Sequence, residues 1–275
     1  MSESLAALVD THCHLNLSAF DANHEEVLDR ARLAGVERIL IPGVDLQSSQ
    51  RAIDLAQKYD EVFAAVGVHP HYVGDWSSAT ADEIASIAQS PKVVAIGEIG
   101  LDYYRNLAPP EKQRVAFEEQ LEIAATLQYP VVVHNRDATE DILDTLNTWT
   151  VNLPPTLSTR AGVLHAFSAD MDSAFEAIRL GFYIGIAGPI TFPNSVNLCS
   201  IASQVPSDRL VIETDSPYMT PEPYRGKKNE PAYLPWIAKK LNDIRNDDYI
   251  TIRTTTENAK NLFKWSHDFT NNNIH

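Results

Sequence analysis

Short apolar runs rich in β-branched residues recur eight times along the chain and alternate with segments of helical periodicity. The runs span Leu8–His12, Arg38–Pro42, Val62–Val68, Val93–Ile99, Val131–His134, Gly162–His165, Phe182–Ile186 and Leu210–Glu213. The helical segments span Glu25–Ala34, Ser48–Tyr59, Ala81–Ala88, Glu111–Leu127, Ala138–Trp149, Met171–Leu180, Ser195–Val205 and Pro231–Ile244. Strands that alternate with helices indicate βαβ units and a parallel sheet, so the predicted fold class is α/β.

Eight strand–helix pairs in 275 residues match a closed (β/α)8 TIM barrel, whose usual length is about 250 residues. A doubly wound open sheet is the alternative, and the lack of a Gly-x-Gly-x-x-Gly motif after the first run disfavours it. No linker divides the chain, so we expect one domain over residues 1–275 with a core over roughly 8–265. Prolines mark Val151–Arg160 and Ser216–Glu230 as loops, and the polar end 270–275 predicts a frayed tail.

The composition, 44% hydrophobic and 21% charged, is that of an ordinary soluble globular protein. No apolar run is long enough to cross a bilayer, and the first residues lack the features of a signal peptide. The two cysteines, Cys13 and Cys199, lie far apart in the sequence, and we interpret both as small, buried apolar residues. Together these features predict a protein of the reducing cytoplasm with no membrane partner and no readable obligate protein partner.

The net charge of −15 limits how this chain can bind nucleic acid. A field of that sign repels polyanions, which argues against an extended groove for duplex DNA or RNA. Chemistry at a single phosphate stays open, because bound divalent cations reverse the local sign. Three cations in the last long loop predict a small basic lip beside the strand ends: Arg225, Lys227 and Lys228.

Histidines gather where the predicted strands end, which is where the active sites of TIM barrels lie. His12 and His14 are two residues apart, so a strand would project both from one face and Cys13 from the other. Four more of the nine histidines follow later strands: His69, His71, His134 and His165. Glu98 and Asp215 also lie at strand ends, so four of these imidazoles and two carboxylates predict a site for two divalent ions.

In this prediction His12, His14 and Asp215 bind one ion, while His134 and His165 bind the other. Glu98 bridges the two, because a carboxylate can span two metals whereas an imidazole nitrogen binds one. The mixed nitrogen and oxygen ligands allow zinc, manganese or magnesium, and imidazole favours the first two.

Each residue of this site also has a purely structural interpretation. Glu98 could be a buried acid paired with Arg136, and His134 and His165 could be hydrogen-bonded core histidines. Asp215 could cap a helix, although the prolines that follow it favour a loop. The shared placement at strand ends favours the metal site over these separate explanations.

Six short motifs carry a resemblance to a known family. They are Asp-Thr-His-Cys-His, Gly-Val-His-Pro, Gly-Glu-Ile-Gly-Leu-Asp-Tyr-Tyr, Val-His-Asn-Arg, His-Ala-Phe-Ser and Glu-Thr-Asp-Ser-Pro. In order and spacing, from Val9 to about Phe263, they resemble the TatD family of the amidohydrolase-like superfamily. The resemblance implies a TIM barrel and a metal-dependent deoxyribonuclease with ligands His12, His14, Glu98, His134, His165 and Asp215.

The resemblance also places His69 toward the substrate, and it has small departures. Ala166 and Ala169 stand where the family often has Cys and Gly, which implies local packing differences only. The segment Leu153–Gly162 is longer than usual before the sixth strand and predicts altered access to the site.

The predicted reaction is hydrolysis of a phosphodiester by a two-metal-activated water, as 3′-5′ exonuclease action on single-stranded or frayed DNA ends. Asp215 binds metal and accepts the proton of the water, which with Glu98 makes the catalytic pair. His69, Arg136 and Tyr103 are the predicted substrate contacts, with Tyr103 stacking on a base. Glu213 shares a face with Asp215 and is predicted to support a histidine ligand.

Several alternatives stay open at this point. Arg136 could instead pair with Glu140, and Tyr103 and Tyr104 could be half-buried loop aromatics. The same metals could hydrolyse another ester or amide, such as the ester of a D-aminoacyl-tRNA, because loops decide the substrate on a given fold. A non-catalytic scaffold is a third class, and the presence of all six ligands argues against it.

Overall fold

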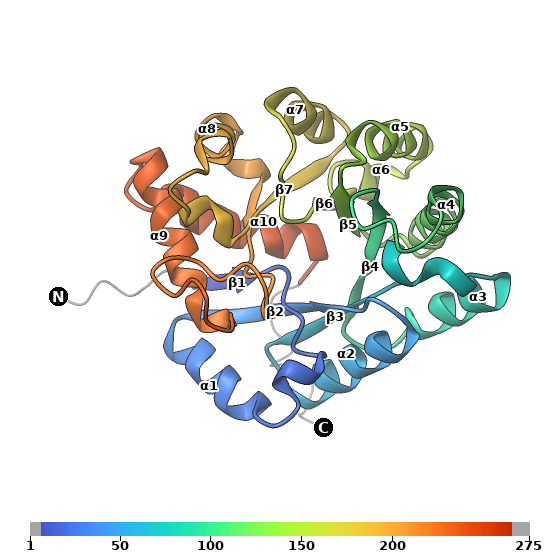
Figure 1. Cartoon of the computed structure of the whole chain (residues 1–275), viewed down its shortest axis with the longest axis horizontal. Coiled ribbons are helices and arrows are strands. Elements are labelled where there is room, and N and C mark those ends of the chain that lie inside the picture. Colours follow the sequence, from blue (N-terminus) through green and yellow to red (C-terminus); the bar gives the residue numbers. More distant parts are fainter. Residues whose placement is uncertain (1–6, 266–275) are drawn as a thin grey trace, which may run out of the picture.

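The computed structural model describes residues 7–265, and its strands form one eight-stranded parallel sheet in the order β1 to β8. The strands are β1 (Leu8–Asp10), β2 (Val36–Pro42), β3 (Val62–Val66), β4 (Val93–Asp102), β5 (Val131–Arg136), β6 (Gly162–Leu164), β7 (Phe182–Ile186) and β8 (Leu210–Ile212). Each strand pairs in parallel with the next along the chain. Figure 1 shows the strands at the centre with helices around them, so the predicted TIM barrel is confirmed.

The predicted helices are present with ends that shift by a few residues. They are α1 (His24–Leu33), α2 (Leu46–Lys58), α3 (Ser78–Ile87), α4 (Pro110–Leu127), α5 (Thr139–Thr150), α7 (Met171–Arg179), α8 (Val196–Gln204) and α9 (Leu234–Arg245). Two helices were not predicted: α6 (Pro155–Ser158), inside an expected loop, and α10 (Ile250–Phe263). Apolar side chains between the strands and the outer helices make the main core.

Backbone hydrogen bonds just beyond β1 and β8 close the barrel. The amide of Thr11 donates to the carbonyl oxygen of Ile212 at 3.2 Å, and that of Asp215 donates to His12 at 2.8 Å. The amide of His14 donates to the carbonyl oxygen of Ser216 at 2.8 Å. Three of the predicted ligands, His12, His14 and Asp215, therefore lie in the segments that close the barrel, which fixes them relative to each other.

Helix α10 closes the opposite end of the barrel. Its residues Leu262 and Phe263, and Trp265 just beyond its last residue, are buried in a second core cluster with residues from the strands. The rings of Phe63 on β3 and Trp265 lie 4.9 Å apart. Because full burial of such a side chain is worth about 1.5–3 kcal/mol, α10 contributes strongly to the barrel.

The segment Leu153–Gly162 does not affect access to the site, contrary to the prediction. It leads into β6 at the N-terminal end of the strands, where Arg160 donates to the carbonyl oxygen of Leu262 in α10 at 2.9 Å. Active sites of this fold lie at the other end of the barrel. The extra length therefore packs against the closing helix.

Among residues 7–265, no helix combines the length and the apolar character that a membrane span requires. Both cysteines are free thiols; Cys13 is buried as predicted, whereas Cys199 is only partly buried. The predicted frayed tail, residues 270–275, lies outside the described residues.

Candidate metal centre

The two histidines that follow β1 lie side by side. Although β1 ends at Asp10, their Nε2 atoms are 3.1 Å apart, and both side chains are buried. Cys13, between them, pairs with Ser216 in an isolated bridge, and its side chain belongs to the hydrophobic core. The alternation predicted for a strand therefore continues past the last residue of β1. It brings two imidazole nitrogens to the mouth of the barrel.

Glu98 of β4 lies at the centre of the site, and its two carboxylate oxygens face different groups of histidines. Oε2 lies 3.3 Å from Nε2 of His12 and 3.5 Å from Nε2 of His14. Oε1 lies 3.0 Å from Nδ1 of His134 and 3.4 Å from Nε2 of His165. A carboxylate with one oxygen toward each of two imidazole pairs has the geometry of a bridging ligand.

The charge of Glu98 is stabilised by these neighbours. Burial alone raises the pKa of its carboxyl, but His69, His165 and His12 outweigh burial and hold the pKa well below its usual range. The carboxylate is therefore ionised at neutral pH, as metal binding requires. No arginine pairs with it among the described residues, so the alternative ion pair with Arg136 is wrong.

Asp215 and His165 complete the group around His12. Oδ1 of Asp215 lies 3.4 Å from Nε2 of His14 and 3.7 Å from Nε2 of His12. The ring of His165 stacks on that of His12 with centroids 3.7 Å apart. Asp215 has a left-handed backbone, φ 54°, in the loop that the prolines predicted, and strain of this kind is concentrated at functional sites.

The donor atoms fit divalent metal ions. Three sets each place their ligand atoms within 4.8 Å of one another: His12, His165 and Asp215; His12, His14 and Glu98; and His69, Glu98 and His134. The structure thus brings together all six predicted ligands. The grouping of ligands between the two ions differs from the prediction in two respects. His165 groups with His12, and His69, a predicted substrate contact, groups with Glu98 and His134. A buried set of imidazoles and carboxylates is the chemistry of zinc and manganese sites.

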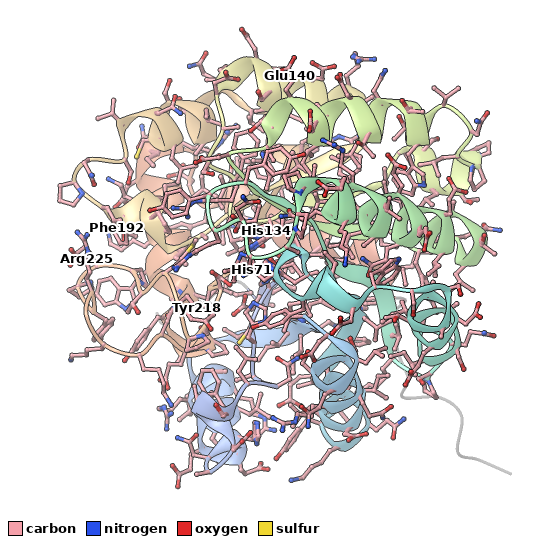
Figure 2. All side chains as sticks on the ribbon, turned by 45° about the vertical axis from the view of Figure 1, so that its right-hand side comes forward. His71, His134, Glu140, Phe192, Tyr218 and Arg225 are labelled. Atoms are coloured by element: carbon pink, nitrogen blue, oxygen red, sulfur yellow. The ribbon has the colours of Figure 1, made fainter. Side chains whose placement is uncertain are left out.

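Asp102, at the end of β4, was missed by sequence reasoning. Its Oδ2 lies 2.7 Å from Nε2 of His71 and 3.1 Å from Nε2 of His134, so one carboxylate oxygen joins the two histidines. Figure 2 shows His71 beside His134. Asp102 is four residues after Glu98 in the same strand, and this even spacing was a signal that both project from one face.

Burial and carboxylates shift the histidine pKa values in opposite directions. Burial lowers the pKa of His12 and, more strongly, that of His69. Burial also acts on His134, but hydrogen bonds to Asp102 and Glu98 outweigh it and raise the pKa. For His165, Glu98 and Glu213 outweigh burial and hold the pKa well above its usual range.

Glu213 supports His165 from below, as predicted. Its Oε1 lies 3.3 Å from Nδ1 of His165 and accepts the amide of Ala166 at 2.5 Å. Its Oε2 accepts the hydroxyl of Thr11 at 3.1 Å. A side chain at Gly185 would come within 2.7 Å of Oε1, so glycine there leaves room for the carboxylate. Nδ1 of His165 makes no hydrogen bond within the described residues, but the buried carboxylate beside it lies where a group that orients a metal-ligating histidine would lie.

Comparison with known proteins agrees with this geometry. The family model for TatD-related DNases matches residues 9–264. This chain belongs to the TatD family. The TatD protein of Salmonella typhimurium, named a 3′-5′ ssDNA/RNA exonuclease, is 38% identical over 94% of this chain and 99% of its own length. YabD of Bacillus subtilis, named an uncharacterized metal-dependent hydrolase, is 38% identical with the same coverage.

A solved TatD homologue from Escherichia coli, YJJV, has the same fold, with a TM-score of 0.88 at 29% identity. The match covers 94% of this chain and 98% of that one. The present chain is therefore a metal-dependent hydrolase of the TatD type.

Arg136 of this TatD-family chain lies at the rim of the site, at the end of β5. Its guanidinium stacks on the exposed ring of Tyr104, 4.6 Å from the ring centroid. No ion pair joins it to Glu140 among residues 7–265, so that alternative is wrong. Figure 2 shows Glu140 at the outer edge of the molecule, away from His134.

Tyr103 is partly buried and is fixed by a hydrogen bond. Its hydroxyl donates to Oδ2 of Asp141 on α5 at 2.5 Å, and its ring is partly buried against the core. Tyr103 thus has the half-buried character of the alternative interpretation, whereas Tyr104 exposes 60% of its surface.

The predicted basic lip is exposed, but each of its cations lies over an aromatic ring. The guanidinium of Arg225 is 4.4 Å from the ring centroid of Phe192, next to which Figure 2 shows it. Lys227 lies over Tyr224 and Lys228 over Phe20, and the ammonium of Lys228 also donates to a backbone carbonyl. Because each cation contacts its own aromatic ring, the three positive charges are held apart along the loop.

A cavity of about 330 Å³ opens beside His134 and His165. Its walls come from the last residues of β5, the segments that follow β6 and β7, the start of α8, and Met219 after β8. The TatD-family site therefore consists of a metal centre and an adjoining pocket.

Proposed function

We propose that this TatD-type hydrolase is a 3′-5′ exonuclease that trims single-stranded or frayed DNA ends. The observation that carries the proposal is Glu98, whose oxygens face two separate groups of imidazoles as a two-metal phosphodiesterase requires. Relatives named 3′-5′ ssDNA/RNA exonuclease, 38% identical over nearly their whole length, support the choice of substrate.

Two divalent ions, zinc, manganese or magnesium, would be held by His12, His14, Glu98, His134, His165 and Asp215. When bound, such ions lower the pKa of a water and offset the charge on the phosphate oxygens. The protein residues would hold the ions in fixed positions, because closure of the barrel fixes Asp215 relative to His12. Glu213 and Asp102 restrain the rings of His165 and His134.

The side chains of this site supply proton transfer and phosphate contacts. Asp215, ionised because the hydrogen bond to His14 and the charges of His165 and His12 outweigh burial in lowering its pKa, accepts the proton of the attacking water. Burial keeps His69 neutral at physiological pH, so it offers one hydrogen bond to a phosphate oxygen. Arg136 at the rim binds the next phosphate along the strand.

Charge favours strand ends over intact duplex. A protein with a net charge of −15 cannot neutralise many phosphates. The exposed ring of Tyr104 and the exposed part of Tyr103 offer stacking surface for an unpaired base, and stacking does not depend on charge. The two free thiols support a reducing, cytoplasmic setting, where one hydrolase domain would remove frayed ends during DNA repair.

The test joins metal analysis to a substrate panel. The purified protein should contain two ions per chain by mass spectrometry, and it should release mononucleotides from a linear single strand with a free 3′ end. A circular single strand and a 3′-blocked strand should persist. Glu98→Ala should lose metal and turnover, while Glu118→Ala, which removes an exposed acid of α4, should keep both. Equal cutting of circles and linear strands, or turnover only of a D-aminoacyl-tRNA, would contradict the proposal.

A further inference from the structure

Two glutamines interrupt the apolar face that α4 buries against the barrel. The buried positions of this helix follow one another at helical spacing: Gln113, Ala116, Phe117, Gln120, Leu121 and Ala124. Gln113 is 0% exposed and Gln120 is 1% exposed, so their amides are as buried as the apolar residues around them. Because a buried polar group costs free energy unless it is hydrogen-bonded, glutamine at these two positions points to specific partners.

Each glutamine binds both backbone groups of a single residue. Oε1 of Gln120 accepts the amide of Val68 at 2.7 Å, and its Nε2 donates to the carbonyl oxygen of Val68 at 3.1 Å. Oε1 of Gln113 accepts the amide of Asp102 at 2.8 Å, and its Nε2 donates to the carbonyl oxygen of Asp102 at 3.2 Å. The second proton of each Nε2 goes to a further backbone carbonyl oxygen, so every proton of the two amides has an acceptor.

Val68 and Asp102 lie beyond the ladder that joins β3 to β4. That pairing ends with Val66 beside Ile96, whereas β4 continues to Asp102. Within a parallel ladder, a neighbouring strand supplies the partners for backbone N–H and C=O groups. The two glutamines supply both partners in place of a strand. Helix α4 therefore holds the chain where the pairing of β3 with β4 has ended.

The two bound residues lead directly to the candidate metal centre. Val68 precedes His69, the proposed phosphate contact, and Oδ2 of Asp102 lies 3.1 Å from Nε2 of His134. His71 links the two segments, since its Nε2 lies 2.7 Å from the same oxygen of Asp102. The glutamines are seven residues apart in one helix, roughly 10 Å along its axis at 1.5 Å per residue. One rigid helix thus sets the spacing of both segments.

We propose that Gln113 and Gln120 are positioning residues of the metal centre, an inference that rests on the roles proposed above for His69 and Asp102. Gln120 places His69 at the phosphate by fixing the residue before it. Gln113 places Asp102 against His134 by fixing the backbone of Asp102. A displacement of about 1 Å near the reacting atoms can cost on the order of 100-fold in rate, so these contacts bear on turnover as well as on folding.

A double-mutant cycle separates positioning by Gln120 from a contribution to stability alone. Gln120→Met keeps the length of the side chain and removes its hydrogen bonds. At saturating metal it should lower kcat/KM for bis(4-nitrophenyl) phosphate by about tenfold, because His69 is displaced. In a His69→Ala background the same substitution should change kcat/KM by less than about twofold, since two residues that act through one contact are not additive.

The matched control is Asn258→Leu on α10. It also removes two buried hydrogen bonds to backbone carbonyl oxygens, but at the opposite end of the barrel. It should lower the thermal midpoint as the glutamine variants do, and it should leave kcat/KM unchanged with and without His69→Ala. If a methionine variant lacks a cooperative thermal transition, Gln113→Glu and Gln120→Glu take its place, because glutamate keeps the shape and the acceptor and loses the donors.

Metal affinity is the readout for Gln113. In competition with a chromophoric chelator, Gln113→Met should bind metal about three- to tenfold more weakly, less than the 10–100-fold that direct loss of a carboxylate partner of a ligand costs. In an Asp102→Ala background Gln113→Met should have no further effect on affinity. Asn258→Leu should bind metal as the wild type does.

The outcomes distinguish this inference from the proposed function. Deficits that multiply in the His69→Ala or Asp102→Ala background, or that Asn258→Leu reproduces, would overturn the inference and leave the glutamines a role in stability alone. A protein that follows the predicted cycles with the small diester and the chelator, yet trims no DNA end, would overturn the proposed exonuclease and leave the positioning role intact.

Discussion

Replacing Glu213 with glutamine removes one buried negative charge and keeps the shape of the side chain. Oε1 of Glu213 faces Nδ1 of His165 at 3.3 Å and accepts the amide of Ala166, while Oε2 accepts the hydroxyl of Thr11. In glutamine the amide oxygen can keep the first two contacts. Thr11 can accept from the new NH2 group and donate to the carbonyl oxygen of Ile212, which is already 3.2 Å away. The packing is therefore preserved, and any effect of Glu213→Gln can be attributed to the loss of the negative charge.

The expected effect is a loss of metal affinity and not of folding. A carboxylate that faces the second nitrogen of a ligating histidine raises the basicity of the ring, and its loss typically costs 10–100-fold in affinity. At about 1.36 kcal/mol per factor of ten, that is about 1.4–2.7 kcal/mol. Because Glu213 touches His165 and no substrate, saturating metal should restore kcat to within a few-fold of wild type.

The assay is competition for metal with a chromophoric chelator, followed by turnover as a function of free metal. Thr11→Val is the matched control: it removes one hydrogen bond to Glu213 but keeps the charge, so metal affinity should change less than about threefold. Wild-type affinity in Glu213→Gln would refute the reasoning. So would a deficit in kcat that persists at saturating metal, because Glu213 would then act on the reaction itself.

Three further predictions concern the bridging acid, the ligand protons and the closing helix. Glu98→Ala should lose one or both ions and most turnover while keeping a cooperative thermal transition by circular dichroism; full metal content with near-normal turnover would exclude a bridging role. Because the pKa of His165 is raised, its proton must leave before metal binds, so metal affinity and activity should fall as the pH falls. Calorimetry in buffers of different ionisation enthalpy should detect proton release on metal binding at neutral pH, above the ordinary imidazole pKa of about 6.5, and its absence would contradict this ligand. Leu262→Ala should lower the free energy of unfolding by about 2–5 kcal/mol in urea, and a loss below about 1 kcal/mol would show that α10 packs weakly.

Much of the fold follows from periodicity, because most strand residues are buried on both faces of the sheet and the outer helices each bury one apolar face. Helix α10 escaped prediction for a specific reason. Its buried face includes Thr251, Thr255 and Asn258, which read as polar positions. The amide of Asn258 donates to the carbonyl oxygens of Ser207 and Leu210 at 2.8 Å, so burial here depends on partners from another part of the chain. Only the tertiary structure reveals those partners.

The candidate metal ligands could be predicted from the sequence because strand ends converge at one mouth in any parallel barrel. The contacts of Arg136 could not be predicted in this way. The predicted pairing of Arg136 with Glu140 assumed helical spacing, but β5 runs to Arg136 and α5 begins only at Thr139. Asp137, between them, has a left-handed backbone with φ 53°, which turns the chain away from that spacing. Arg136 stacks on Tyr104 instead.

Charge and geometry together limit how this enzyme can hold a strand. The cations of the loop after β8 each lie over an aromatic ring, and the chain as a whole carries a charge of −15. A long single strand would meet repulsion at most of its phosphates, and each would add little to binding. Under the proposed function, affinity must then come from a few sites at close range: the metal centre, the stacked pair of Arg136 and Tyr104, and the cavity beside His134. Sites so close together can contact only a few nucleotides at a time, which is compatible with the proposed action at strand ends and not with a long binding channel.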